Sequence, residues 1–419
     1  MLVLYNWGIR VYFVAICFAA FFNKKARLWL NGRKNQFFNK NGTCIWFHFA
    51  SLGEFEQGRP VLEKMRSLHP EKKIVITFFS PSGYEIRKNT PLADEVYYLP
   101  LDTAKNAREF VGAIQPEMAI FTKYEYWYHF FNELNQRKIP LYVISGIFRP
   151  DQVFFKWHGG LHRKILSFVT HFFVQDDQSK QLLQHIGINN ATVSGDTRFD
   201  RVWANAQQPN PLPIIADFKK DHKIFIAGST WPPDEQLVAS LVNDYPEWKF
   251  IVAPHEISEE KINKLIDLLP ANSVIRYSQL TTPTMPPTIY QTLVIDNIGM
   301  LSSLYQYGDI AYIGGGFGTG IHNTLEAAAF GLPVIFGPNY SKFKEAKDLT
   351  ALNAGFSISN ETGLKQVAGK LINNEQFYTD ASRQIRIYVE EHTGATATII
   401  SHVSPNDFNP VSLNINHIP

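Results

Sequence analysis

The residues best suited to chemistry lie in a glycine-rich stretch late in the chain, residues 308–338. A short apolar run at 310–313 breaks into glycines, and Asn323, three residues before Glu326, predicts a helix that starts near Asn323. Glycines let a backbone approach a ligand closely, and free N–H groups at a helix start favour phosphate. The Glu326 carboxylate can accept hydrogen bonds from ribose hydroxyls. The stretch predicts a nucleotide-phosphate site; the alternative is a tight turn that binds no ligand.

The same glycines do not match the dinucleotide-binding fingerprint. That fingerprint needs glycines at its first, third and sixth positions, early in a βαβ unit. Gly314 and Gly316 are followed by Thr319, and Gly316 and Gly318 are followed by Ile321. The chain also lacks the Gly-Lys-Ser/Thr sequence of a Walker-type loop. The spacing therefore argues against a Rossmann dehydrogenase.

Length and composition set the outer limits. The 419 residues are enough for two domains, and the 45% hydrophobic content is ordinary for a globular protein. A net charge of +2 argues against a general nucleic-acid binder. Two cysteines, Cys17 and Cys44, can form neither a disulfide framework nor a zinc site alone, which predicts a reducing cytoplasmic setting.

The N-terminal end of the chain is apolar and then basic. The apolar run at 11–22 is short for a membrane span of about 20 residues, and it passes into Asn23-Lys24-Lys25 without a cleavage site for a signal peptide. Glu54 is the first acidic residue of the chain. The charged residues that precede it are all basic: Arg10, Lys24, Lys25, Arg27, Arg33, Lys34 and Lys40. We expect an uncleaved anchor in or on the membrane, with its basic flank on the anionic cytoplasmic leaflet. The alternative is a buried N-terminal helix.

Strand-like and helix-like segments alternate through the rest of the chain. The expected strands are residues 44–49, 73–79, 96–99, 118–121, 141–144, 171–174, 223–227, 249–253, 274–277, 292–295, 310–313 and 333–336. Such alternation implies mostly parallel sheets covered by helices. The proline-bearing segment 207–220 is the expected linker. We therefore predict an anchor and basic segment at 1–40, an N-terminal α/β domain at 41–206 and a C-terminal α/β domain at 207–419.

Two such domains, with the nucleotide loop in the second, predict a GT-B glycosyltransferase architecture: two Rossmann-like α/β domains that face each other across a cleft. Ligands of open parallel sheets bind at the carboxyl ends of the strands. Four loops of the second domain follow expected strand ends, namely Gly228-Ser229-Thr230, Pro254-His255-Glu256, residues 296–300 and the glycine-rich turn. Together they predict one ligand site.

In the first domain, Glu54 follows the strand at 44–49 and a glycine turn, just before an expected helix at 55–68. This position suits a general base. An inverting glycosyl transfer needs one group that accepts the proton of the acceptor hydroxyl while phosphate leaves from the opposite face. The alternative is that Glu54 only occupies the first turn of a helix, where a carboxylate favours the helix dipole.

In these residues the chain resembles the 3-deoxy-D-manno-octulosonic acid (Kdo) transferases, which move Kdo from CMP-Kdo onto the lipid A precursor. The resemblance extends from the apolar N-terminus to roughly residue 395. It rests on an ordered and specific set of motifs: Gly32-Arg33-Lys34, Ser51-Leu52-Gly53-Glu54, Glu125-Tyr126-Trp127, residues 195–200 (GDTRFD), Gly228-Ser229-Thr230, Gly314-Gly315, and His322-Asn323-Thr324-Leu325-Glu326.

The resemblance implies a role for each matching position. Glu54 would be the proton acceptor, and Lys123 and Arg198 stand at positions of transition-state stabilisation. The implied nucleotide-binding residues are Ser229, Thr230, Pro254, His255, Ile298, Gly299, Met300, Gly315, Gly316, Asn323, Thr324, Leu325 and Glu326. The implied acceptor-binding residues are Arg33, Lys34, Ser51, Gly53 and Glu125.

Several positions depart from the commoner family pattern. Arg198 stands where many members have Lys, which keeps the positive charge. Lys123 stands where many have Glu, which reverses the charge and leaves the role of Lys123 open. His255 stands where Arg is usual, and Gly146-Ile147-Phe148-Arg149 replaces Ala-Arg-Leu-Ser. We interpret these as changes specific to one branch of the family.

The basic N-terminal segment has a physical purpose under this reading. The lipid A precursor is an amphiphile that carries phosphates, so Arg33 and Lys34 can hold its phosphates while its acyl chains stay in the bilayer. The alternative is that these charges only set membrane topology.

We therefore predict an inverting Kdo transferase of lipopolysaccharide core biosynthesis, at the cytoplasmic face of the inner membrane. Its expected partners are the donor CMP-Kdo, the acceptor lipid A precursor (lipid IVA) and anionic membrane lipid, with no nucleic acid. No Asp-x-Asp motif stands in the nucleotide loops, so we expect no metal and no cofactor. The alternatives are another GT-B transferase that uses a UDP-sugar, and an inactive lipid-binding protein on the same scaffold.

Overall fold

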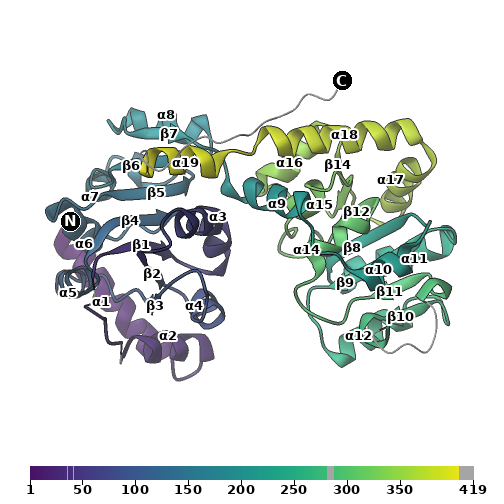
Figure 1. The fold of residues 1–419 in the computed structure, drawn as a ribbon, viewed down its shortest axis with the longest axis horizontal. Coiled ribbons are helices and arrows are strands. Elements are labelled where there is room, and N and C mark those ends of the chain that lie inside the picture. Colours follow the sequence, from purple (N-terminus) through teal and green to yellow (C-terminus); the bar gives the residue numbers. More distant parts are fainter. Residues whose placement is uncertain (35, 41, 281–286, 405–419) are drawn as a thin grey trace. The chain divides into compact units, whose positions relative to one another are not determined.

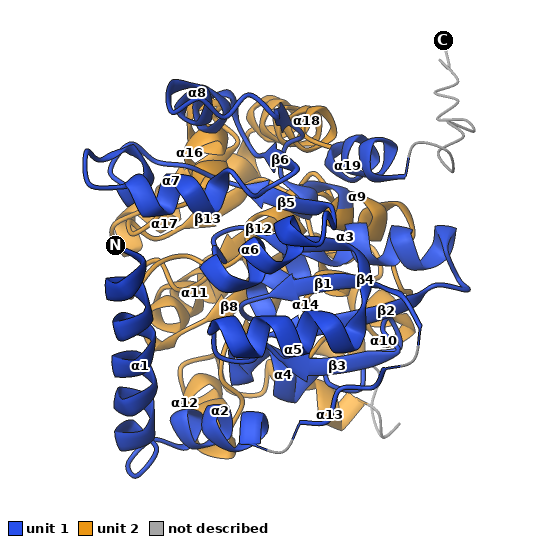
Figure 2. Ribbon diagram, turned by 90° about the vertical axis from the view of Figure 1, so that its left-hand side faces the viewer, with its two compact units in different colours: residues 1–200, 394–419 blue, residues 201–393 orange. Residues whose placement is uncertain are grey.

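The chain forms two compact α/β units in a computed structural model that describes residues 1–34, 36–40, 42–280 and 287–404 (Figures 1 and 2). Unit 1 comprises Met1–Asp200 together with the chain from Gly394 onward, and unit 2 comprises Arg201–Thr393. Each unit contains a seven-stranded sheet in which the paired strands are parallel. These are the two Rossmann-like α/β domains of the predicted fold class.

The sheet of unit 1 has the order β3-β2-β1-β4-β5-β6-β7. Its strands are β1 (Cys44–Phe49), β2 (Lys73–Phe78), β3 (Glu95–Tyr98), β4 (Pro116–Thr122), β5 (Leu141–Gly146), β6 (His171–Val174) and β7 (Ala191–Val193). Every residue of β1 is buried, because helices cover both faces of the sheet. This explains why the strand is a continuous apolar and aromatic run in the sequence.

Helices connect and cover these strands (Figure 1). They are α3 (Leu52–Leu68), α4 (Pro81–Arg87), α5 (Ala104–Ile114), α6 (Tyr128–Gln136), the 3-10 turn η1 (Val153–Phe155), α7 (Gly160–Leu166), α8 (Asp177–His185) and α9 (Thr197–Gln207), which runs on into unit 2. Side chains at the helix starts satisfy free backbone N–H groups: Ser80 accepts from Ser82, Thr103 from Asn106, and Asp176 from Ser179.

The sheet of unit 2 has the order β10-β11-β9-β8-β12-β13-β14. Its strands are β8 (Ile224–Thr230), β9 (Lys249–Pro254), β10 (Val274–Arg276), β11 (Thr292–Val294), β12 (Ile310–Ile313), β13 (Val334–Phe336) and β14 (Gly355–Ser357). Its helical segments are α10 (Pro213–Lys219), α11 (Pro232–Asp244), α12 (Glu259–Asp267), α13 (Tyr277–Leu280), η2 (Pro287–Ile289), α14 (Leu301–Leu304), η3 (Tyr305–Tyr307), α15 (Leu325–Ala328), α16 (Lys344–Ala351), α17 (Glu361–Asn373) and α18 (Glu375–Glu391).

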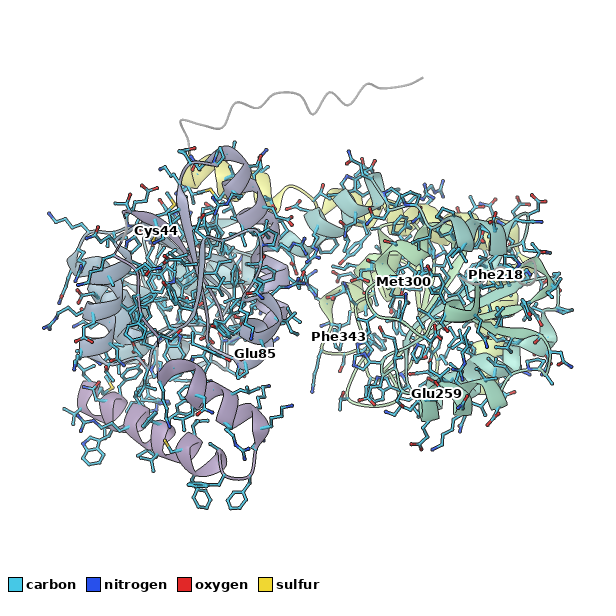
Figure 3. All side chains as sticks on the ribbon, turned by 60° about the horizontal axis from the view of Figure 1, so that its bottom comes forward. Cys44, Glu85, Phe218, Glu259, Met300 and Phe343 are labelled. Carbon is cyan, nitrogen blue, oxygen red and sulfur yellow. The ribbon has the colours of Figure 1, made fainter. Side chains whose placement is uncertain are left out.

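Apolar side chains fill the interior of each unit (Figure 3), with Cys44 inside unit 1 and Phe218 inside unit 2. Trp46 of β1 is fully buried and meets the rings of Phe110 and Phe121 edge-on. Edge-to-face pairs of this kind add to the stabilisation that comes from burying the rings. The predicted strands are confirmed, several of them to within one residue, whereas the short strands β7 and β14 were not predicted.

The C-terminal helix α19 (Ala395–Val403) packs in unit 1. Its residues Ile399, Ile400 and Val403 lie in the same apolar cluster as α3 and β1. The Asp200 carboxylate accepts hydrogen bonds of 2.6 Å from the backbone N–H groups of Gly394 and Thr396 and from the Thr396 hydroxyl. The units therefore differ from the expected domains, which divided the chain at 206/207 and assigned all later residues to the second domain.

The N-terminal segment forms helix α1 (Leu2–Ala19) and helix α2 (Lys24–Lys34). Helix α1 is long and apolar enough to cross a membrane by length and composition. No residue of α1, which the structure describes in full, is buried. The alternative of a buried N-terminal helix is therefore wrong for this chain.

Replacing Asp200 with Ala should reduce the free energy of unfolding of unit 1 by about 1–3 kcal/mol, because the start of α19 loses its carboxylate acceptor. Thr396→Val removes only the hydroxyl bond and should cost less. Urea unfolding followed by circular dichroism measures both variants. Equal stability of Asp200→Ala and the unchanged protein would show that the carboxylate does not hold α19.

Candidate active site

Glu54 occupies the third position of helix α3, which begins at Leu52 after the cap residue Ser51. Its Oε2 accepts a hydrogen bond of 2.6 Å from the backbone N–H of Ala50, so the carboxylate folds back onto the turn between β1 and α3. The helix thus starts earlier than expected, and Glu54 lies in its first turn. This position alone fits both the general base and the dipole-favouring carboxylate.

The ionisation of Glu54 is unusual for a carboxyl group. Burial is the main cause and the nearby charge of Glu125 the second; together they raise the pKa of Glu54 to about 7. The Ala50 N–H and the Lys123 ammonium oppose this shift, because both favour the charged form. A carboxyl group that titrates near neutral pH can accept and release a proton under ordinary conditions.

Glu125 is held by two ring N–H groups. Its Oε2 lies 2.8 Å from the donor Nε1 of Trp127 and 3.4 Å from Nε2 of His48. His48 is fully buried on β1, and burial lowers the pKa of His48, so its ring is neutral. The other ring nitrogen, Nδ1, lies 2.8 Å from the hydroxyl of Thr77, its direct register partner on β2. When Thr77 donates to Nδ1, the Nε2–H of His48 is left to donate to Glu125.

The two candidate cations of unit 1 have different surroundings. Lys123 follows β4 with a left-handed backbone (φ 60°), and its charge acts on Glu54. The Arg198 guanidinium donates from Nε and Nη2 to Oδ2 of Asp196 at 2.9 and 2.7 Å. Oδ1 of Asp196 accepts in turn from Nε2 of Gln57, at 3.0 Å. Asp196 thereby links Arg198 to Gln57 of helix α3.

The predicted acceptor residues do not share one environment. The Arg33 side chain points inward and donates to the backbone carbonyls of Leu99 (2.8 Å) and Phe79 (2.7 Å). Its guanidinium carbon stacks 3.8 Å from the centre of the Trp29 ring. Burial lowers the pKa of Arg33 to about 9. Arg33 therefore ties α2 to unit 1, whereas Lys34 is exposed at a cavity of about 360 Å³.

Ser51 and Gly53 lie at the same β1–α3 turn as Glu54, where Ser51 is partly buried and Gly53 is exposed. The structure therefore brings Ser51, Gly53 and Glu54 together, with Glu125 and Lys123 close enough to act on the Glu54 carboxylate. Residues that sequence reasoning missed are His48, Gln57 and Asp196, whose roles depend on contacts between distant parts of the chain.

In unit 2, the four predicted segments lie at the carboxyl ends of strands that are direct neighbours in the sheet, β11-β9-β8-β12. Gly228-Ser229-Thr230 was expected to be a loop but forms the end of β8, and Pro254 is the last residue of β9. Because parallel strands share a carboxyl edge, the four segments meet at one edge of the sheet. Ile298 is 92% exposed there, whereas Met300 is buried. Gly299 between them has a left-handed backbone with φ 95°, a conformation that favours glycine.

The glycine turn after β12 is held tightly. Gly315 has φ 92°, and its N–H donates to Oδ2 of the buried Asp234 at 2.9 Å. A Cβ atom on Gly316 would lie 2.6 Å from the backbone of Gly337. Packing alone thus requires glycine at both positions, and the alternative of a purely structural turn explains these two residues as well as a ligand does.

The helix after the turn, α15, starts at Leu325 with Thr324 as its cap residue, close to the predicted start. The side-chain oxygen Oδ1 of Asn323 accepts from the Leu325 N–H at 3.1 Å, and its side-chain nitrogen Nδ2 donates to Oε1 of Glu326 at 3.1 Å. Burial raises the pKa of Glu326, against the lowering effects of the Asn323 amide and the Arg201 charge. Within the described residues, the buried hydroxyl of Thr324 has no hydrogen-bond partner.

Three aromatic rings stack beside the turn. The His255 ring lies 4.9 Å from the Trp231 ring and 4.3 Å from the His322 ring, measured between centroids. Nε1 of Trp231 donates to Nε2 of His322 at 3.1 Å, and burial lowers the pKa of His322. Trp231 was not predicted from the sequence, although it directly follows Gly228-Ser229-Thr230.

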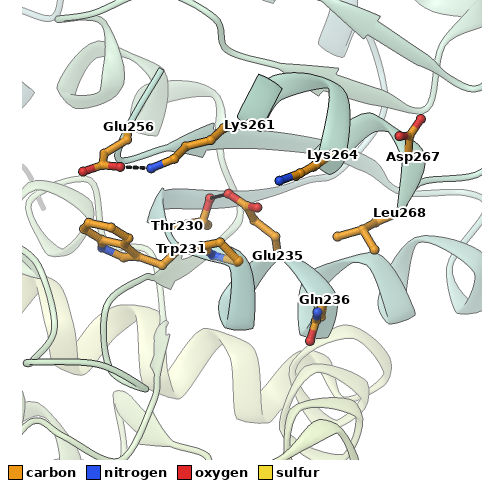
Figure 4. Close-up of a pocket in the computed structure, with 10 residues that line it drawn as sticks. Thr230, Trp231, Glu235, Gln236, Glu256, Lys261, Lys264, Asp267 and Leu268 are labelled. Atoms are coloured by element: carbon orange, nitrogen blue, oxygen red, sulfur yellow. Dashed lines mark hydrogen bonds and ion pairs between the residues drawn. The ribbon is translucent and has the colours of Figure 1, made fainter. Parts of the chain in front are cut away.

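Trp231 also lines a pocket of about 290 Å³ between α11 and α12 (Figure 4). The buried Thr230 hydroxyl donates to Oε1 of Glu235 at 3.2 Å, and Ser229 before it has a left-handed backbone (φ 55°). At the rim, the Lys261 ammonium pairs with Glu256. Pro254 ends β9 at the same edge. Within the described residues, no group of three or more His, Cys, Asp or Glu side chains could hold a metal ion.

The chain is similar to known proteins over most of its length. Residues 24–201 match the family model described as 3-deoxy-D-manno-octulosonic-acid transferase (Kdo transferase). The chain is 26% identical over 367 residues to the 3-deoxy-D-manno-octulosonic acid transferase of Chlamydia trachomatis serovar A, covering 84% of each chain. It is 25% identical over 386 residues to that of Haemophilus influenzae, covering 88% of this chain and 89% of the relative.

A bifunctional glycosyltransferase/methyltransferase of Fusobacterium nucleatum is 25% identical over 393 residues, and the match spans 89% of this chain but 59% of that protein. Among solved structures, UDP-GlcNAc 2-epimerase from Neisseria meningitidis aligns with a TM-score of 0.61 at 14% identity, over 87% of this chain and all of that chain. MurG of Acinetobacter baumannii aligns with a TM-score of 0.53 at 12% identity, over 87% and 99%. At such identities the solved structures show the fold alone, which is of the predicted GT-B type.

Replacing Gly316 with Ala should reduce the free energy of unfolding of unit 2 by about 1–3 kcal/mol, because the new methyl group overlaps the Gly337 backbone. Gly318→Ala is the matched control, since a Cβ atom there meets its nearest neighbour, the Gly315 carbonyl oxygen, at 3.6 Å, an ordinary contact. Urea unfolding measures both. If the two variants are equally stable, the turn is not packed as described.

Proposed function

We propose the acceptor substrate, the donor substrate and the general base of this chain, which belongs to the Kdo transferase family and is a glycosyltransferase that transfers Kdo. The enzyme inverts the anomeric centre as it moves Kdo from CMP-Kdo to the lipid A precursor (lipid IVA), in lipopolysaccharide core biosynthesis. Glu54 is the general base. The observation that carries this proposal is a carboxyl group with a pKa of about 7 at the carboxyl end of β1.

The proposed step forms one bond and breaks one. An acceptor hydroxyl oxygen attacks the anomeric carbon of Kdo, and the bond from that carbon to the phosphate oxygen of CMP breaks. The phosphate leaves with the electron pair, and the hydroxyl proton passes to the Glu54 carboxylate. Attack from the face opposite the phosphate inverts the anomeric configuration, so no covalent intermediate with the protein is needed.

Under this proposal Glu125 adds to the effect of burial, the main cause of the raised pKa of the base. Its negative charge raises the pKa of Glu54, and the Trp127 and His48 N–H groups hold the Glu125 carboxylate in place. Lys123 counteracts Glu125 by favouring ionised Glu54. We assign Lys123 the role of limiting the rise in the pKa of Glu54. Arg198, shared with Asp196, remains the candidate for stabilising charge in the transition state.

The proposed donor site is the carboxyl edge of the unit 2 sheet. The N–H groups at the start of α15 and the glycine turn suit the CMP phosphate, and Glu326, oriented by Asn323, suits the ribose hydroxyls. The Thr324 hydroxyl adds an unused donor at the same place. The remaining predicted contacts are Ser229, Thr230, Pro254, His255, Ile298, Gly299, Met300, Gly315, Gly316 and Leu325.

The proposed acceptor site and location follow from unit 1. Arg33 is committed to backbone carbonyls, so Lys34 is the better candidate for an acceptor phosphate, with Ser51 and Gly53 at the turn beside the base. The exposed apolar residues of α1 and the basic residues Lys24 and Lys25 suit an anionic membrane. We place the enzyme at the cytoplasmic face of the inner membrane.

The whole proposal is tested by incubating the protein with CMP-Kdo and tetraacylated lipid A precursor, followed by mass spectrometry of the lipid. A mass gain that corresponds to Kdo, with release of CMP, is expected. Transfer only from a UDP-sugar would instead identify another GT-B transferase. Lipid binding without CMP release would identify an inactive lipid-binding protein.

Replacing Glu54 with Gln should lower the transfer rate by about 10²–10⁴-fold, because the amide cannot accept the proton. Binding of CMP to unit 2 should be unchanged, which calorimetry checks. Near-normal turnover of Glu54→Gln would remove Glu54 from this role.

The pH dependence of kcat tests the same hypothesis. Only the carboxylate form accepts a proton, so kcat should rise with pH through about 7, the pKa of Glu54. Glu125→Gln removes the neighbouring negative charge, and the rise should move to lower pH. A profile that does not move in Glu125→Gln would separate Glu125 from the base.

Replacing Glu326 with Ala should weaken CMP binding by about 1.5–3 kcal/mol, the range for hydrogen bonds to charged groups. Calorimetry measures this, with UMP as the comparison nucleotide. Glu345→Ala, another largely buried glutamate of unit 2, is the control for general effects on folding. An unchanged CMP affinity would mean that the glycine turn is structural or serves another ligand.

A further inference from the structure

We infer that helix α1 lies along the membrane interface and does not cross the bilayer, and that the loop before α7, which carries Trp157, is a second point of membrane contact. The inference rests on the membrane association proposed above and adds its orientation and its second contact. Its occupant is the surface of an anionic phospholipid bilayer.

One face of α1 is fastened to unit 1 by polar contacts. The Tyr5 hydroxyl donates to Oδ2 of Asp102 at 2.5 Å and accepts from the Tyr128 N–H at 3.3 Å. The Asn6 side-chain oxygen lies 2.7 Å from Nε2 of His129. Asp102 is only 2% exposed. An α1 helix that stood across a bilayer would leave these groups, and a buried carboxylate would lose its hydroxyl donor.

The opposite face of α1 is apolar and open. Large apolar residues that are each at least 60% exposed recur at helical spacing along it: Val3, Leu4, Trp7, Val11, Val14 and Phe18. Phe21 and Phe22 continue the stripe beyond the helix and are 75% and 82% exposed. A continuous apolar stripe of this length marks an interaction surface.

The charges around the stripe favour an anionic bilayer over a protein partner of mixed charge. Arg10, Lys24 and Lys25 are exposed, and the sequence holds no acidic residue before Glu54. A helix with an apolar face and basic flanks lies in the interface between head groups and acyl chains. The anionic lipid of a cytoplasmic leaflet attracts these cations.

The loop before α7 adds a separate anchor point. Trp157 is 92% exposed, and it is flanked by the exposed residues Lys156 and His158. The loop is held in shape because Nη1 of Arg163 donates to the carbonyls of Phe154 (3.0 Å) and Lys156 (2.8 Å). Tryptophan favours the membrane–water interface, because its ring is apolar and its N–H polar.

This loop and α1 lie on the same side of unit 1. A Cβ atom on Gly160, at the start of α7, would lie 3.1 Å from the end of the Met1 side chain. Figure 2 shows α1 along one side of unit 1, with α7 near its N-terminal end. A flat bilayer surface that touches the stripe of α1 can therefore also reach the Trp157 loop.

The two orientations of α1 predict different depths. Eighteen residues at 1.5 Å per residue make α1 about 27 Å long, close to the thickness of the hydrocarbon core. In an upright helix, positions 3 and 18 lie near opposite surfaces of the bilayer and position 11 lies near its centre. In a flat helix they lie at one shallow depth, together with position 157.

Depth is measured on the full chain with single cysteines. Cys17→Ser removes one of the two native cysteines, and Cys44 is buried and stays. Val3→Cys, Val11→Cys, Phe18→Cys and Trp157→Cys each carry an environment-sensitive fluorophore. Vesicles of phosphatidylethanolamine and phosphatidylglycerol carry nitroxide quenchers at the head group or deep in the acyl chains. All four labels should be quenched best by the head-group nitroxide, whereas a label at Ile387→Cys of unit 2 should stay unquenched.

A label at position 11 that is quenched best by the deep nitroxide, with Trp157→Cys unquenched, would overturn the inference in favour of a spanning helix. Labels that change on self-association but respond to neither nitroxide would identify a protein partner instead. The vesicles contain no acceptor, so failure of the Kdo transfer assay would leave this result standing, and the reverse also holds.

The second contact has its own test. Trp157→Ser should lower partitioning onto the same vesicles by roughly ten-fold, the effect of removing one buried aromatic side chain. Ile387→Ser is the matched control, because Ile387 is an exposed apolar residue of unit 2, and it should partition like the unchanged protein. Equal partitioning of Trp157→Ser and the unchanged protein would remove the loop from the membrane contact.

Discussion

Parallel pairing of the strands is the constraint on which the rest of this structure depends. In each sheet every paired strand runs in the same direction, so all carboxyl ends lie at one edge. The strands are largely buried, so the chemistry depends on the strand ends and the loops at that edge. The general-base candidate follows β1 in unit 1, and four candidate donor segments lie at the carboxyl ends of neighbouring strands in unit 2.

Partial burial then gives the polar groups at these edges their properties. Burial away from water raises the pKa of Glu54 and lowers the pKa of His48, because it disfavours the charged form of each group. Hydrogen bonds compensate elsewhere: Asp196 neutralises Arg198, and backbone carbonyls receive the Arg33 guanidinium. Arginine therefore has two different roles in unit 1. Arg33 holds α2 to the rest of the unit, whereas Arg198 is a candidate for taking part in the reaction.

Helix α1 shows how one apolar segment can serve two surfaces. Tyr5 and Asn6 on one face make specific polar contacts with unit 1, and the apolar residues of the opposite face have no such contacts and are exposed. Composition alone does not distinguish this helix from one that crosses a bilayer, since both are apolar and of similar length. The two polar side chains on one face make the difference.

The sequence by itself determined the alternation of elements, the two α/β units and the motifs at the strand ends. It could do so because a strand buried on both faces must be a continuous apolar run, and the residues that follow it are adjacent in the chain. It did not predict β7 and β14, because three-residue edge strands have too few residues to show a pattern. Only the tertiary structure decided that α19 returns to unit 1, that Arg33 points inward, and that His48, Thr77 and Glu125 meet. Those contacts join residues far apart in sequence, and they depend on strand register and helix packing, which a local pattern does not encode.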